Sequence, residues 1–196
     1  HKQSRNKKFN FKTENQDNNK LIFSDNFFEV SVYGNTRFIN YYKDEKYFLL
    51  IDGYCFFDDR LLQCKDLLHY FKKNKFNFVS RCKGSFNFFL YDINSKILNV
   101  KTDLFGSRPL FYTNQKNAFN ITSRLSDIFK NKNINPEICE KAKQEYFYFK
   151  FFIQNSKTLF KGCFIFPTNK SVIIKNRNVK WEDYDIPKFN FSEESL

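Results

Sequence analysis

Residues 101–112 read KTDLFGSRPLFY, and this stretch does most to decide the fold. It carries an acid, Asp103, a glycine, Gly106, and the adjacent pair Arg108 and Pro109. The whole chain has only five glycines in 196 residues. Glycine is retained where the backbone needs a positive φ or where two backbones approach closely. We therefore expect Gly106 to hold such a position.

Short strands flank this stretch on both sides. Residues 29–33 alternate with a period of two, and residues 47–51 form a continuous apolar run. These patterns are typical of half-buried and fully buried strands. The turn signals Gly34-Asn35 and Asp52-Gly53 follow the two runs. The expected strands are 8–12, a hairpin of 29–33 with 36–39, and then 47–51, 84–92, 97–102, 109–112, 118–122, 163–167, 171–175 and 179–181.

Helical periodicity is clearest between residues 58 and 73, where apolar residues recur at spacings of three and four. Asp58 and Asp59 supply the acids expected at the start of this helix, and Asn135 is the expected cap of a later one. The expected helical segments are 58–73, 78–82, 125–130 and 135–149. Many antiparallel strands with a few helices predict an α+β layered domain.

The composition limits the class of protein. Hydrophobic residues make up 41% of the chain, which is too apolar for a disordered protein, and no run approaches the roughly 18 apolar residues of a membrane-spanning helix. The formal net charge of +12 favours nucleic acid or an acidic surface as a partner. However, 26 of the basic residues are Lys and seven are Arg, a bias that an AT-rich genome also produces. We therefore expect neither nucleic acid nor a membrane as the main partner.

The five cysteines are odd in number and scattered, with no Cys-x-x-Cys pair among them. This pattern argues against a disulfide framework and against a structural zinc site. The first twenty residues are polar and do not read as a secretory signal. We therefore expect a cytoplasmic protein without a metal site.

The 101–112 stretch resembles the R-D-x-x-G-x-R-P-L-Y-Y signature of the glutamine amidotransferase domain of asparagine synthetases. Asp103, Gly106, Arg108 and Pro109 stand on its motif positions. Three further blocks resemble the same family in the same order: LIDG at 50–53 resembles N-G-E, KGSFNFFLYD at 83–92 resembles D-G-x-F-A-F-x-L-Y-D, and TLFKG at 158–162 resembles T-x-F-x-G. Four of the five glycines lie on motif positions.

The resemblance implies an α+β fold, the four-layer αββα sandwich of N-terminal-nucleophile hydrolases, for an amidotransferase-like domain at residues 21–187. A flexible N-terminal segment is expected at 1–20. Residues 188–196 are expected to be a linker or tail towards an ATP-binding synthetase domain, present in cis or in trans. ATP and Mg are expected only in that domain, and no cofactor is expected in this chain.

Several residues that the family uses for glutamine differ here. The family's nucleophile is an N-terminal Cys, whereas this chain begins with His1. The family's oxyanion-binding Asn matches Asp52, and a carboxylate cannot donate hydrogen bonds to a developing negative charge. The family's Asp that holds the substrate ammonium matches Lys83, which has the opposite charge. The expected degenerate glutamine-pocket positions are Arg37, Asp52, Gly53, Tyr54, Lys83 and Gly84, and no catalytic residue is expected.

These differences predict the N-terminal domain of an asparagine-synthetase-like, ATP-dependent amide-forming enzyme without glutaminase activity. It is similar in this respect to the Cys-less domains of β-lactam synthetases and lasso-peptide cyclases, and its expected role is structural or the shaping of a substrate cleft. One alternative is an active glutamine-hydrolysing domain whose N-terminal Cys is missing from this chain. A second alternative is a basic module that binds nucleic acid or an acidic peptide. Self-association and the substrate of any attached synthetase are left open.

Overall fold

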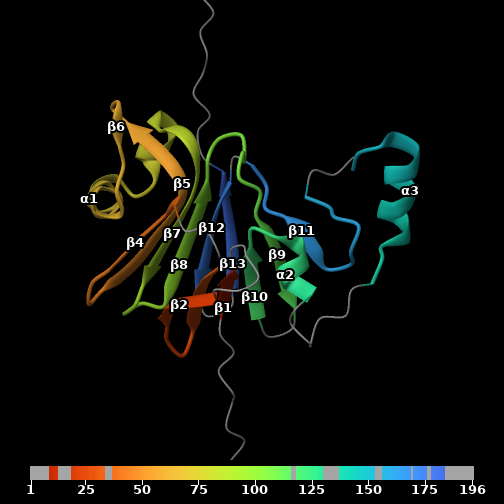
Figure 1. Ribbon diagram of the computed structural model, residues 1–196, viewed down its shortest axis with the longest axis horizontal. Coiled ribbons are helices and arrows are strands. Elements are labelled where there is room, and N and C mark those ends of the chain that lie inside the picture. The colour runs from red at the N-terminus through yellow and green to blue at the C-terminus, as the bar shows by residue number, and fades with distance from the viewer. Residues whose placement is uncertain are drawn as a thin grey trace, which may run out of the picture.

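Two β-sheets packed face to face form the body of the protein, with helices at its periphery (Figure 1). The computed structural model describes residues 9–12, 19–33, 37–115, 118–129, 137–152, 156–168, 170–175 and 178–183. The expected turn at Gly34-Asn35 and the expected cap Asn135 lie outside these residues.

One sheet has six strands within the described residues, in the order β11-β9-β10-β1-β3-β2. Their bounds are β1 Phe9–Lys12, β2 Asn19–Ser24, β3 Phe28–Tyr33, β9 Phe111–Gln115, β10 Ala118–Thr122 and β11 Cys163–Ile165. The strand β1 pairs in parallel with both β3 and β10, and the other pairs are antiparallel. Part of the segment 1–20 therefore lies inside this sheet.

The other sheet has seven strands over the same described part of the chain, in the order β13-β12-β8-β7-β5-β4, with β6 paired to β5. Their bounds are β4 Ile39–Lys43, β5 Tyr47–Phe57, β6 Arg60–Leu61, β7 Lys83–Asp92, β8 Ile97–Thr102, β12 Lys170–Lys175 and β13 Asn178–Asp183. The long antiparallel pair β5 and β7 runs through the middle of this sheet and ends at the segments that carry the family motifs.

The core has two main parts because the seven-stranded sheet is covered on both faces. Alternate residues of its strands, such as Phe48 and Phe89, point towards the six-stranded sheet and pack with Phe28. The residues between them, such as Leu49 and Phe88, point to the opposite face. Burying one such side chain stabilises the fold by about 1.5–3 kcal/mol, so the period-two pattern fixes which face each residue occupies.

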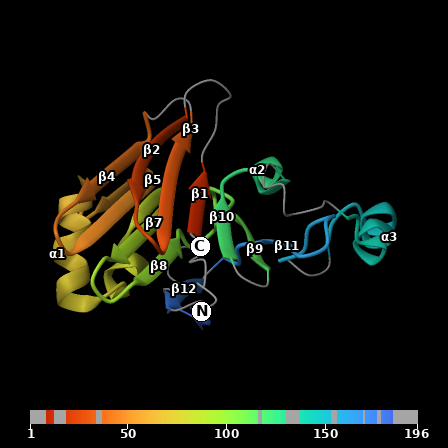
Figure 2. The same ribbon diagram turned by 90° about the horizontal axis from the view of Figure 1, so that it is seen from below.

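Three α-helices and one 3₁₀ helix lie within the described residues: α1 Cys64–Asn74, η1 Asn77–Arg81, α2 Leu125–Phe129 and α3 Glu140–Phe149. The pair α1 and η1 covers the outer face of β5 and β7. The helix α2 has five residues and packs beside β9 and β10. Figure 2 shows α3 standing apart from both sheets.

The expected four-layer αββα sandwich is therefore wrong. The structure is mostly β, and among the described helices only α1 with η1 forms a layer over a sheet. The physical reason is clearest in α3, whose one buried residue is Ala142. Its aromatic residues from Tyr146 to Phe149 are exposed, so α3 does not form a layer over either sheet.

Local expectations are partly confirmed. The strand expected at 47–51, the pair expected at 84–92 and 97–102, and the short helix expected at 78–82 are all present. The expected hairpin of 29–33 with 36–39 is wrong, because β3 and β4 belong to different sheets. The expected turn at Asp52-Gly53 is also wrong, since β5 runs through both residues to Phe57.

The acids Asp58 and Asp59 are not at a helix start. Both have positive φ, 49° and 58°, in the tight turn between β5 and β6. Two-residue hairpin turns favour this left-handed conformation, which Asp tolerates better than most residues. The helix α1 begins five residues later than Asp59, at Cys64, after the cap Gln63.

Candidate functional site

The site begins where β5 and β7 approach each other at two glycines. Gly53 has φ 111° and Gly84 has φ 131°, as expected for glycines retained in a glycine-poor chain. A Cβ atom on Gly53 would lie 2.1 Å from the carbonyl oxygen of Ser85, and one on Gly84 would lie 2.4 Å from that of Tyr54. Each glycine thus makes room for the opposite strand, and the two backbones meet more closely than any other residue allows.

The loop from Asp103 to Arg108 closes over this junction because Asp103 holds it from inside. Asp103 is 3% exposed. Its carboxylate accepts hydrogen bonds from the amides of Phe105 at 3.0 Å and Ser107 at 3.1 Å, and from the Ser107 hydroxyl at 2.7 Å. It also accepts the amide of Phe86, at the start of the buried part of β7, at 3.2 Å. A buried carboxylate with several donors of this kind fixes the loop to the sheet.

An ion pair between Asp52 and Arg108 fills the centre of the site. The Asp52 side chain is 2% exposed, and its Oδ1 accepts from the Nε of Arg108 at 3.2 Å and from Nη2 at 2.6 Å. Asn87, directly opposite Asp52 on β7, donates from Nδ2 to the other carboxylate oxygen at 3.2 Å and to the Arg108 carbonyl at 3.2 Å. Both oxygens of the buried acid are therefore paired, as a buried charge requires.

This arrangement decides what the Asp52 position can do chemically. An ionised carboxylate accepts hydrogen bonds and donates none, and its neighbours already use both of its oxygens. A site that stabilises a developing oxyanion needs donors aimed at that oxygen. Asp52 would repel such a charge, and the Arg108 groups that could attract it are turned to Asp52.

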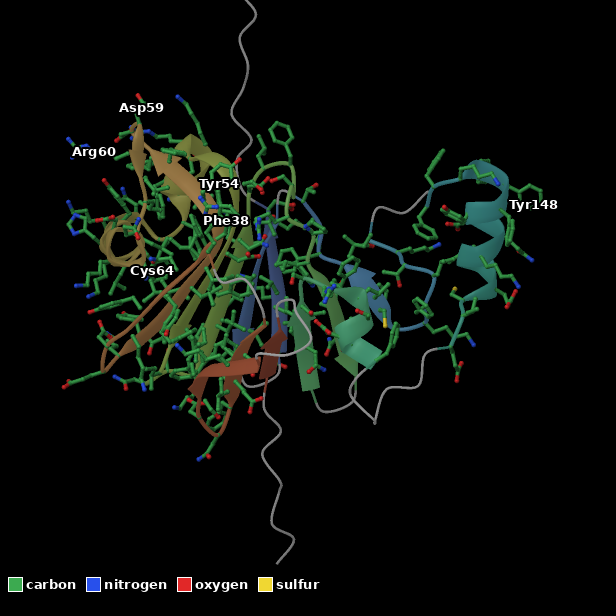
Figure 3. All side chains as sticks on the ribbon, viewed as in Figure 1. Phe38, Tyr54, Asp59, Arg60, Cys64 and Tyr148 are labelled. Atoms are coloured by element: carbon green, nitrogen blue, oxygen red, sulfur yellow. The ribbon has the colours of Figure 1, made fainter. Side chains whose placement is uncertain are left out.

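Aromatic side chains surround the junction on the solvent side. Figure 3 shows Tyr54 and Phe38 close together at this end of the seven-stranded sheet. The backbone carbonyl of Phe38 accepts a hydrogen bond from the amide of Gly53 at 2.8 Å. The exposed fractions are 46% for Tyr54, 51% for Phe38 and 78% for Phe105 in the neighbouring loop. Exposed aromatic side chains thus lie near a buried ion pair whose two carboxylate oxygens are both hydrogen-bonded.

Not all of the predicted positions gather here. Asp52, Gly53, Tyr54 and Gly84 lie at the junction, where Arg108 contacts Asp52 and Gly53. Lys83 begins β7 on the exposed surface, where its ammonium lies 3.4 Å from a carboxylate oxygen of Asp59.

The last predicted pocket position, Arg37, lies on an exposed turn, with its guanidinium 5.9 Å from the ring of Phe38. Among the motif positions, Pro109 follows Arg108 in the segment that leads into β9.

Sequence reasoning missed Asn87, Ser85 and Ser107. Asn87 is fully buried, and its Oδ1 has no hydrogen-bond partner among the described residues. A single Asn inside the apolar run FNFFLYD was a usable signal, because a polar side chain in a buried strand needs a partner. The hydroxyls of Ser85 and Ser107 lie 2.7 Å apart and join β7 to the loop, which no spacing in the sequence reveals.

The thiols near this site are not activated as catalytic nucleophiles. Cys55 and Cys64 are both buried. A hydrogen bond with the thiol of Cys82 and burial raise the pKa of Cys55 far above its usual range, and burial raises the pKa of Cys64 to about 12. Since the thiolate is the reactive form, neither side chain has the environment of a catalytic cysteine. Within the part of the chain that the structure describes, no group of His, Cys, Asp and Glu could hold a metal ion.

A cavity of about 490 Å³ lies elsewhere, on the outer face of the seven-stranded sheet. Its walls include Phe71 and Phe76 near the end of α1, and its floor includes Asn99 and Lys101 on β8. None of the predicted glutamine-pocket positions lines it, and neither do Asp103, Gly106, Arg108 and Pro109. The glycine junction, and not this cavity, is therefore the site that the family motifs define.

Comparison with known families agrees with the motifs. The profile of the family described as glutamine amidotransferase domain matches residues 63–185, which is more than half of the chain. The chain therefore belongs to the glutamine amidotransferase domain family. A comparison with curated proteins gave no match. Among the described helices, none is both long and apolar enough to cross a membrane.

Proposed function

We propose that this chain is an amidotransferase-like domain without glutaminase activity, and that it serves an asparagine-synthetase-like, ATP-dependent amide-forming enzyme as a structural or substrate-cleft domain. The observation that carries the loss of activity is the ion pair of Asp52 with Arg108. It puts a buried, fully paired carboxylate where the resemblance expects an amide that donates to the oxyanion.

Charge supports the same conclusion from a second direction. Hydrolysis of the glutamine amide passes through a tetrahedral intermediate with a negatively charged oxygen, and donors that bind this oxygen are often the largest single contribution to catalysis. At the position where the resemblance expects a donor to this oxygen, the side chain is instead the carboxylate of Asp52. Where the resemblance expects an acid for the substrate ammonium, Lys83 instead pairs with Asp59 at the surface. Glutamine therefore has neither of the two anchors that it would need.

The motif block 101–112 supports the second half of the proposal, the partnership with a synthetase domain. In this block Asp103, Ser107 and Arg108 all make hydrogen bonds within the domain, and these bonds fix the loop to the sheet. A domain that retains this structural loop but has different residues at the substrate-contacting positions is suited to a structural role. The exposed aromatic side chains of Phe38, Tyr54 and Phe105 could line an acyl-substrate cleft once a synthetase domain packs beside them. ATP and Mg would then bind in that domain.

The test is a calorimetric titration of the protein with glutamine, alongside the Asp52→Asn variant. We expect no saturable heat for the natural sequence up to millimolar glutamine, because the Asp52 carboxylate is already paired with Arg108 and Asn87. Saturable binding by the natural sequence that Asp52→Asn leaves unchanged would contradict the proposal, and would favour the alternative of an active domain with its Cys outside this chain.

A further inference from the structure

Cys55 and Cys82 lie next to each other although 26 residues separate them in the sequence. Cys55 is in β5 directly opposite Gly84 of β7, and Cys82 immediately precedes β7. Residues at diagonal positions of an antiparallel pair share one face of the sheet. The Cys82 thiol lies close enough to Cys55 to raise its pKa, and both side chains pack in or against the apolar cluster between the sheet and α1.

These two cysteines stand at the base of one excursion of the chain. Residues 56–81 leave β5, form β6, α1 and η1, and return at Cys82 to start β7. This excursion is the helical layer that covers the outer face of β5 and β7 (Figure 1). A bond between the two sulfurs would therefore close the whole layer at the point where it joins the sheet.

We propose that Cys55 and Cys82 form a reversible disulfide, which makes this helical layer a redox-responsive element of the domain. The oxidant is a low-molecular-weight disulfide such as glutathione disulfide. The Cys82 thiolate attacks it, releases one glutathione thiolate, which takes up a proton, and leaves a mixed disulfide. The Cys55 thiol then loses its proton as it attacks the Cys82 sulfur, and the departing glutathione thiolate takes up that proton. Two protein thiols are oxidised by two electrons and one glutathione disulfide is reduced to two thiols, so the step balances.

Exposure explains why Cys82 reacts first. Cys82 is partly exposed, whereas Cys55 has 0% of its surface accessible. Because Cys55 is buried next to Cys82, it reaches the mixed disulfide from the interior of the protein. The other buried thiol of this cluster, Cys64, donates instead to the carbonyl of Asn40 at 3.1 Å, so it is not placed to compete. Cys139 is far along the chain, before α3, and is partly exposed like Cys82.

The consequence of closure is a more stable domain. A disulfide removes conformational freedom from the unfolded chain, and a loop of this length is expected to raise the melting temperature by roughly 5–15 °C. The junction of Gly53 with Ser85 lies two residues from Cys55. Oxidation would therefore also stiffen the wall of the candidate site.

The test treats the reduced protein with glutathione disulfide and maps its peptides by mass spectrometry without reduction. We expect a Cys55–Cys82 cross-link, a fall in titratable thiols from five to three, and reversal of both by dithiothreitol. Cys82→Ser should abolish the cross-link and the rise in melting temperature, whereas the matched variant Cys139→Ser should retain both. Stable mixed glutathione adducts without the cross-link, or a cross-link that joins Cys55 to another cysteine, would overturn the proposal.

Discussion

The guanidinium of Arg108 holds the buried carboxylate of Asp52 through two of its N–H groups, across 56 residues of sequence. Asp52 is 2% exposed and Arg108 is 33% exposed, so the acid depends on this partner more than the base does. The pair joins β5 to the loop that carries the family signature. It therefore links the stability of the domain to the position where the resemblance expects an oxyanion-binding amide.

The first prediction concerns this pair. Asp52→Asn keeps the shape of the side chain but removes the charge that Arg108 and Asn87 solvate. We expect the free energy of unfolding to fall by about 2–4 kcal/mol, below the full cost of breaking a buried pair because Arg108 remains partly hydrated. Urea denaturation of the variant and the natural protein measures this difference in the free energy of unfolding. The control is Asp59→Asn, whose pair with Lys83 is exposed and should change stability by no more than about 0.5 kcal/mol. Equal losses in the two variants would contradict the structure.

The second prediction concerns the glycine junction. Gly53→Ala would place a Cβ 2.1 Å from the backbone oxygen of Ser85 and 2.7 Å from the Cδ of Arg108. Since the backbone oxygen cannot move aside without shifting β7, we expect a loss of about 2–4 kcal/mol. Gly106→Ala is the control, because its Cβ would meet the side-chain methyl of Thr168 at 2.6 Å, and we expect about 1–2 kcal/mol there. Thermal melts of both variants measure these losses of stability. A smaller loss at Gly53 than at Gly106 would contradict the close approach of Gly53 to the backbone of Ser85.

The third prediction uses Asp25, which joins the two sheets at their other end. Burial favours its neutral form, but hydrogen bonds from the amides of Phe27 and Phe28, the Tyr91 hydroxyl and the Lys96 ammonium outweigh burial and hold the pKa of Asp25 below its usual value. A lowered folded-state pKa stabilises the protein above the unfolded-state value of about 3.9. That contribution is lost as the pH falls through the folded pKa.

Asp25→Asn should therefore lower stability at neutral pH, by about 1–2 kcal/mol for the lost charge-assisted hydrogen bonds. Its difference from the natural protein should shrink as the pH falls below about 4. The control is Asp44→Asn, because the Asp44 carboxylate likewise accepts hydrogen bonds from two backbone amides in a turn, those of Lys46 and Tyr47. Chemical denaturation between pH 3 and 7 compares them. A gap between Asp25→Asn and the natural protein that stays constant over this range would contradict the sign.

The sequence predicted the strands and the special backbone positions better than their partners. The apolar run at 47–51 could only be a buried strand, and the scarcity of glycine correctly marked Gly53 and Gly84 as positions of positive φ. Periodicity says which face a strand buries but not which strand it pairs with. For that reason residues 29–33 and 36–39 suggested a hairpin, although β3 and β4 lie in different sheets.

The centre of the site was harder to foresee. Asp52 was identified as a departure from the family motif, yet nothing in its neighbourhood pointed to Arg108 as its partner, because the two meet only when β5 and the 103–108 loop close together. The same limit applies to the layers. The helical periods were present in the sequence, but how little of α3 is buried became evident only from its surroundings.

The most direct test is the release of glutamate from glutamine by the natural protein, with any residues that precede or follow this chain. The account predicts no release above the uncatalysed background at any glutamine concentration, because the Asp52 position cannot donate to the developing oxyanion. Saturable glutamate release that is abolished by a glutamine-directed thiol inhibitor would contradict it.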